Sequence, residues 1–69
     1  MDIKNLQNIF TFHPVKGNQT EKYQEIRLSA LNLSILINDM CPESAEKTTS
    51  IRKLQEAVMF ANASIAIHE

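Results

Sequence analysis

The 69-residue chain has few of the residues that cross-link small proteins or interrupt helices. It contains one cysteine, one glycine, two prolines and no tryptophan. A single cysteine cannot form an internal disulfide, and the chain lacks the clustered ligands that a metal site needs. Domains this short bury a small share of their surface and usually rely on disulfides, a metal or oligomerisation. The composition therefore leaves oligomerisation as the means of stabilisation.

Neither sign of charge is in excess, because seven basic and eight acidic residues give a net charge of −1. A general nucleic-acid binder shows a basic excess, so we expect no DNA or RNA polymer as a partner. The longest purely apolar run is Ile35-Leu36-Ile37, far below the roughly 20 residues needed to span a bilayer. The N-terminus lacks the apolar stretch of a signal peptide, and the lone Cys41 fits a reducing compartment. These features predict a cytoplasmic protein that does not engage a membrane.

Residues 19–40 carry the first long helical pattern. Asn18 followed by Glu21 is a helix-start signal, and Thr20 is an equal candidate for the cap. Apolar residues then recur at spacings of three and four, which is typical of a helix packed lengthwise on another: Tyr23, Ile26, Ala30, Leu33, Ile37 and Met40. A second row makes the apolar face wider than one partner helix needs: Leu28, Leu31 and Ile35.

A turn at residues 41–43 separates this helix from a second one over residues 44–67. Pro42 cannot continue the first helix and suits the first turn of the next. The second helix repeats the spacing of three and four: Ile51, Leu54, Val58, Ala61 and Ile65. Two helices of about 20 residues joined by a tight turn predict an antiparallel hairpin over residues 18–69, in a chain of one domain.

Residues 1–17 predict a short helix followed by an arm. Apolar residues recur at helical spacing after Asp2, which can cap the helix: Ile3, Leu6 and Phe10. Pro14 then favours an extended conformation at His13. The expected fold is all-α: an antiparallel helical hairpin with a short N-terminal helix and arm. Because the outer apolar rows would otherwise be exposed, we expect the hairpins to assemble into a compact homo-oligomer.

The residues show no catalytic pattern, and no HExxH, P-loop or GxGxxG motif occurs. His13 and His68 lie at opposite ends of the sequence, and Cys41 has no base beside it in sequence. We therefore expect a protein that is not an enzyme and that has no cofactor and no metal. Helical carboxylate pairs are explained more simply as a solvated outer face.

One arrangement favours a small ligand. Phe12 and His13 supply π faces on the arm, and Arg27 supplies a cation on the first long helix. Stacking groups near a guanidinium suit an aromatic anion such as a nucleotide. Tyr23 lies one turn before Arg27, and the two residues can equally form a local cation–π pair.

Four segments form an ordered series: Phe12-His13-Pro14, Tyr23-Gln24-Glu25-Ile26-Arg27, Cys41-Pro42-Glu43-Ser44 and Leu54-Gln55-Glu56-Ala57-Val58-Met59-Phe60-Ala61-Asn62-Ala63-Ser64-Ile65-Ala66. The series resembles the small helical-hairpin family of phage anti-CBASS proteins, whose hairpin also occurs in anti-Thoeris sponges. The resemblance covers roughly residues 10–69, and the last block is its most specific part, since the rest is generic helix patterning.

The resemblance implies a sponge. Such a protein binds the cyclic oligonucleotide messengers of bacterial CBASS cyclases without cleaving them, so that the downstream effector stays inactive. It also implies a compact homohexamer of interlocked hairpins in the cytoplasm of the host cell, with ligand pockets between protomers. One class of pocket holds cyclic dinucleotides, including cGAMP-like molecules, and a separate class holds cyclic trinucleotides in some members.

The family's functional residues map onto the arm and the first long helix. The aromatic residue that stacks on a nucleobase falls on Phe12, where many relatives have tyrosine, and the basic residue that meets phosphate falls on Arg27. His13 and Pro14 would shape the same arm, and Tyr23 beside Arg27 completes the candidate ligand-binding set. An arginine near the family's C-terminus is replaced here by Ile67, which puts the trinucleotide pocket in doubt.

The residues themselves leave two alternatives to a sponge. A structural or protein-binding hairpin oligomer would use the same apolar faces and bind no small molecule. A small hydrolase would need a dense polar cluster.

Overall fold

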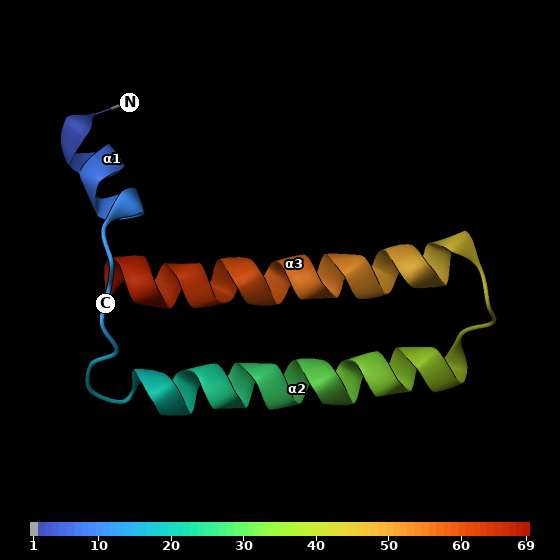
Figure 1. Ribbon diagram of the computed structural model, residues 1–69. Helices are drawn as coiled ribbons and strands as arrows, with labels where there is room; N and C mark the ends of the chain where they lie inside the picture. The colour runs from blue at the N-terminus through green and yellow to red at the C-terminus, as the bar shows by residue number, and fades with distance from the viewer. Residues whose placement is uncertain (1) are drawn as a thin grey trace.

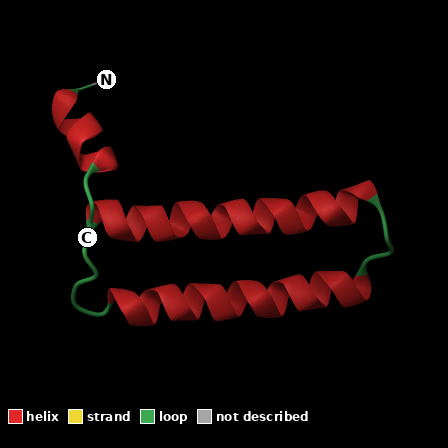
Figure 2. Cartoon of the chain, in the orientation of Figure 1, coloured by secondary structure: helices red, strands yellow, loops and turns green. Residues whose placement is uncertain are grey.

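The computed structural model describes residues 2–69, and over that range it contains three helices and no strand (Figures 1 and 2). The helices are α1 (Ile3–Phe10), α2 (Gln19–Met40) and α3 (Ala45–His68). Figure 1 shows α2 and α3 side by side and antiparallel, with α1 standing off the end where α2 begins and α3 ends. The predicted all-helical hairpin is therefore confirmed.

Side-chain caps explain where two of the helices begin. The Asp2 carboxylate accepts a hydrogen bond from the Lys4 amide at 3.3 Å, and the Ser44 hydroxyl accepts one from the Lys47 amide at 3.1 Å. Because Ser44 is the cap, α3 begins at Ala45, and Pro42 lies in the preceding turn. The expectation that Pro42 occupies the first turn of α3 is wrong for this reason.

The start of α2 differs from the expectation in its chemistry. Asn18 lies at the N-cap position, but its side chain makes no capping hydrogen bond. The next residue, Gln19, instead accepts a hydrogen bond from the Lys16 amide through its side-chain oxygen at 3.2 Å. Gly17 precedes both with φ +58, in the left-handed region that favours glycine, and it turns the chain into α2.

The contact between α2 and α3, called the seam here, buries little apolar surface. Among residues 2–69, no hydrophobic side chain is fully buried. Leu33 and Met40, which the heptad pattern places in the seam, are 45% and 75% exposed, and the polar Ser34 is half-buried instead. The physical reason is that a straight helix has 3.6 residues per turn and drifts away from a strict heptad repeat along its length.

The chain as a whole, α1 included, is flat, with principal extents of 46 × 29 × 12 Å. Its radius of gyration is 15.4 Å, whereas a compact chain of this length has about 11 Å. Large apolar side chains remain exposed around both long helices: Leu28, Leu31, Ile35, Leu36, Met59 and Phe60. Within the range described, no helix is long and apolar enough to span a membrane.

Candidate functional site

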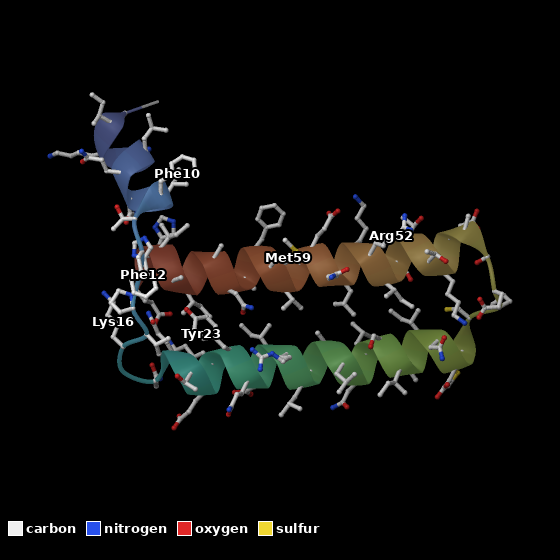
Figure 3. The ribbon with its side chains drawn as sticks, viewed as in Figure 1. Phe10, Phe12, Lys16, Tyr23, Arg52 and Met59 are labelled. Atoms are coloured by element: carbon white, nitrogen blue, oxygen red, sulfur yellow. The ribbon has the colours of Figure 1, made fainter. Side chains whose placement is uncertain are left out.

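The arm between α1 and α2 presents Phe12 at the end of the hairpin (Figure 3). The ring is 84% exposed. On one side of it, the Thr11 hydroxyl donates a hydrogen bond to the Gln7 carbonyl. On the other side, His13 Nε2 lies 2.6 Å from the Asn8 carbonyl oxygen. Both carbonyls belong to the last turn of α1, where helical partners are missing, so the neighbours of Phe12 cap α1 and leave the ring free.

Tyr23 and Arg27 lie on α2, one turn apart. Tyr23 is half-buried, and Figure 3 shows it at the same end of the hairpin as Phe12 and Lys16. Arg27 is exposed and lies about 12 Å along the helix axis from the start of α2. Over residues 2–69, Arg27 takes part in none of the ion pairs, so its guanidinium remains available to an anion.

A groove of about 260 Å³ runs beside the seam and includes Arg27. Its other polar members are Ser34 on α2 and Gln55 on α3, and the remainder of the lining is apolar. A guanidinium, a hydroxyl and a carboxamide along an apolar strip can contact an anion that also carries flat apolar surfaces.

A second groove of about 470 Å³ shares three seam residues with the first: Ala30, Leu54 and Val58. The residues that line only one groove lie on different sides of α2, so the two grooves flank the seam on its two faces. Glu25 and Ser29 are the polar members of the second groove. Its mainly apolar lining suits packing against another apolar surface rather than recognition of an anion.

The structure divides the candidate residues into two groups. Phe12, His13 and Pro14 lie on the arm at the hairpin end, whereas Arg27 lies in the smaller groove. Neither groove is lined by Tyr23 or by any of the three arm residues. One chain therefore brings Phe12 near the end of α2 that holds Tyr23, but it does not enclose Phe12 and Arg27 in a common pocket.

Sequence patterns did not predict the polar network at this end of the hairpin, which joins α1 and the start of α2 to the end of α3. Gln19 is only 3% exposed, and its Nε2 donates a hydrogen bond to the Ile65 carbonyl at 3.4 Å. Asn8 Nδ2 donates to the Ile67 carbonyl at 3.3 Å. Lys22 Nζ also forms an ion pair with Glu69 at 2.6 Å. Nothing in the spacing distinguishes these side chains from solvated ones, because their partners lie at the far end of the sequence.

A similar contact between the two long helices occurs at the end of the hairpin that carries the turn. Lys47 is 7% exposed, and its ammonium donates to the Asn38 carbonyl at 2.9 Å and to Glu43 Oε1 at 2.5 Å. Asn38 lies in the last turn of α2, where backbone carbonyls lack helical partners. A polar side chain near the start of each long helix thus contacts a carbonyl near the end of the other. The spacing of Glu43 and Lys47 gave no signal for this contact, because Glu43 lies in the turn before α3 and the pairing of residues four apart applies within a helix.

Comparison with known proteins identifies a family. The family model described as "Acb2/Tad1, hairpin domain" matches residues 1–66. The match includes the arm, both long helices except the last residues of α3, and every candidate residue named above. No curated protein and no solved structure matches the chain.

Proposed function

The chain belongs to the Acb2/Tad1 hairpin-domain family, and from that premise we propose that it sequesters cyclic dinucleotide immune messengers without cleaving them. Membership confirms the resemblance found in the sequence and implies a phage sponge for immune signalling molecules. The proposal adds the ligand class, a homohexameric assembly and action in the cytoplasm of the infected host. A sponge lowers the free messenger concentration by binding, so it needs no catalytic residue.

The observation that carries the choice of ligand is that one chain has both an exposed aromatic ring, on the arm, and an unpaired guanidinium, in the smaller groove. Phe12 offers a stacking face, and Arg27 offers a charge that no carboxylate of residues 2–69 neutralises. A cyclic dinucleotide has two base faces and two negative charges. Two symmetry-related copies of Phe12 and Arg27 would match these features one for one. His13 and Pro14 would shape the arm, and Tyr23 would contact the ligand from the start of α2.

Assembly would supply the enclosure that one chain lacks. The single chain exposes 5637 Å², whereas a compact monomer of 7.8 kDa exposes about 4,400 Å². The difference of about 1,200 Å² exceeds the area of about 800 Å² that each partner buries in an ordinary stable interface. Apolar side chains on both sides of the seam suit contacts with more than one neighbour, as a hexamer requires.

We propose cyclic trinucleotides as weaker ligands. The resemblance implies an arginine where this chain has Ile67, a half-buried residue near the end of α3 that lies just beyond the matched residues 1–66. An isoleucine provides no donor for a phosphate, so a pocket that depended on this position would lose its charge.

A second candidate function is a protein-binding hairpin with no small-molecule ligand. The observation that favours it is the apolar surface of α1, where four large side chains are exposed: Ile3, Leu6, Ile9 and Phe10. A protein partner would cover such a surface, and cyclic nucleotides would then leave the thermal unfolding of the chain unchanged.

Calorimetry with a panel of cyclic di- and trinucleotides tests the proposal. We expect saturable binding of cyclic dinucleotides and recovery of the intact ligand after the protein is denatured. Linear products would indicate a phosphodiesterase, and a lack of binding across the panel would refute the sponge.

Matched variants test the assigned residues. Phe12→Ala removes one stacking contact, worth about 1–3 kcal/mol per base, so the dissociation constant should rise about 5- to 150-fold. Phe10→Ala is the matched control, because Phe10 is also 84% exposed and lies nearby on α1 (Figure 3). Arg27→Ala should weaken binding and make it less sensitive to salt, whereas Arg52→Ala on α3 should not. If each variant and its control changed the dissociation constant equally, the assignment of Phe12 and Arg27 to the ligand site would be contradicted.

A further inference from the structure

Asn8 connects three parts of the chain at once. Its backbone carbonyl accepts the hydrogen bond from His13 Nε2 at 2.6 Å, and its side chain donates to the Ile67 carbonyl at 3.3 Å. Because a carbonyl only accepts, His13 must carry a proton on Nε2, as it does in one neutral tautomer and in the imidazolium. The arm is thereby linked through α1 to the last turn of α3.

Gln19 makes the corresponding connection downstream of Phe12. Its side-chain oxygen accepts from the Lys16 amide at 3.2 Å, and its side-chain nitrogen donates to the Ile65 carbonyl at 3.4 Å. The side chain is 3% exposed, so water cannot readily replace these partners. The segment that holds Phe12 is therefore attached at both ends to the same turn of α3.

The two attachments leave Phe12 as an exposed ring on a restrained backbone. Thr11 and His13 are held to α1 on either side of it, as described above. A ring on a restrained backbone loses less freedom when a ligand arrives than a ring on a loose arm, so affinity is gained without any additional contact to the ligand. A loose arm would have to be ordered at each binding event.

We propose that Asn8 and Gln19 are positioning residues for Phe12. Together with Thr11 and His13 they form an arm brace, defined by these four residues, which preorganises the ring for a cyclic dinucleotide. This inference rests on the proposed function and adds to it two residues that would not touch the ligand. Both bonds to α3 are long for N–H···O hydrogen bonds, so we expect each to contribute modestly and the pair to contribute more.

A double-mutant cycle with the full chain separates positioning from a general structural effect. With 3′,3′-cyclic GMP–AMP as the probe, Asn8→Ala should raise the dissociation constant about three- to tenfold when Phe12 is present. In the Phe12→Ala background the same change should have less than about a twofold effect, because the residue acts only through the ring. Asn5→Ala is the matched control, since Asn5 is an exposed asparagine on the same helix.

Gln19 is tested in the same cycle with a variant that preserves its size. Gln19→Glu keeps an oxygen that can accept from the Lys16 amide and loses the donor to Ile65. It should weaken binding by a similar factor, and Gln19→Ala serves as a second variant. An equal loss of affinity with and without Phe12 would show a merely structural role and overturn the inference.

Amide hydrogen exchange of the free protein gives a readout that needs no ligand. Asn8→Ala and Gln19→Glu should accelerate exchange of the Lys16 amide, which donates to the Gln19 side chain, about tenfold or more and leave the centres of α2 and α3 unchanged. Unchanged exchange in a chain that binds the probe would overturn the arm brace and spare the proposed function. If the natural chain binds no cyclic dinucleotide, the proposed function fails and the positioning role fails with it.

Discussion

Phe60→Glu distinguishes an isolated hairpin from an assembled one. Phe60 lies on α3 with 74% of its surface exposed, so α2 leaves the ring largely uncovered. In a lone hairpin the substitution removes little packing and places a charge in water. The free energy of unfolding should then change by no more than about 0.5 kcal/mol.

The expected magnitude is very different if another chain covers Phe60. The variant then loses the burial of a phenylalanine side chain, worth about 1.5–3 kcal/mol, and places an unpaired carboxylate in the contact, which adds several more. A loss of at least about 3 kcal/mol corresponds to an association constant lowered by a factor of about 100 or more. In a closed ring the loss recurs at each equivalent contact.

Sedimentation equilibrium and native mass measurement over a dilution series provide the assay. We expect the natural chain to assemble and to unfold at lower temperature on dilution, and the variant to dissociate at concentrations where the natural chain does not. Thr48→Glu is the control, because it introduces the same charge at an exposed polar residue near the start of α3. Two results would refute an assembly that covers Phe60. One is a natural chain that sediments as a 7.8 kDa monomer, and the other is a Phe60→Glu variant whose assembly has the same mass as that of the natural chain.

Three further predictions concern the stability of the hairpin itself. Lys47→Met keeps the buried stem and removes the bonds to Asn38 and to Glu43, so it should cost about 1–2 kcal/mol, or roughly 7–14 °C in melting temperature. Lys53→Met, whose side chain is 70% exposed, should cost less than about 0.5 kcal/mol, and equal melting temperatures would contradict the role of the buried ammonium. Ser44→Ala removes the cap of α3 and should cost about 1 kcal/mol, with Ser44→Asp restoring most of it in the same melting experiment. Gly17→Ala places a side chain at φ +58, where the added Cβ meets no atom within 4 Å, so denaturant titration should show a loss of about 1 kcal/mol from backbone strain alone.

Local spacing was sufficient to predict the helices and the hairpin. Apolar residues three and four apart select a helical face, and Pro42 prevents α2 from continuing, so both features follow from neighbours in the chain. The same spacing erred at Leu33 and Met40, because a heptad template assumes a supercoil that a straight helix does not follow. The division of the chain into one domain and the ligand role of Phe12 and Arg27 stay predictions.

What the sequence determined by itself is therefore the set of helices, the place of the turn, the surplus of apolar surface and the likeness to a family of sponges. Only the tertiary structure decided which polar side chains meet across the hairpin. The register between α2 and α3 brings Lys47 to the end of α2 and Gln19 to the end of α3, and α1 comes to rest where Asn8 reaches Ile67. Asn8 and Gln19 lie far from their partners in sequence, and Lys47 reaches Asn38 across the turn. A periodic pattern specifies the face of a helix but not its offset along a neighbour. The packed chain alone could place Phe12 on a restrained arm and Arg27 in a separate groove.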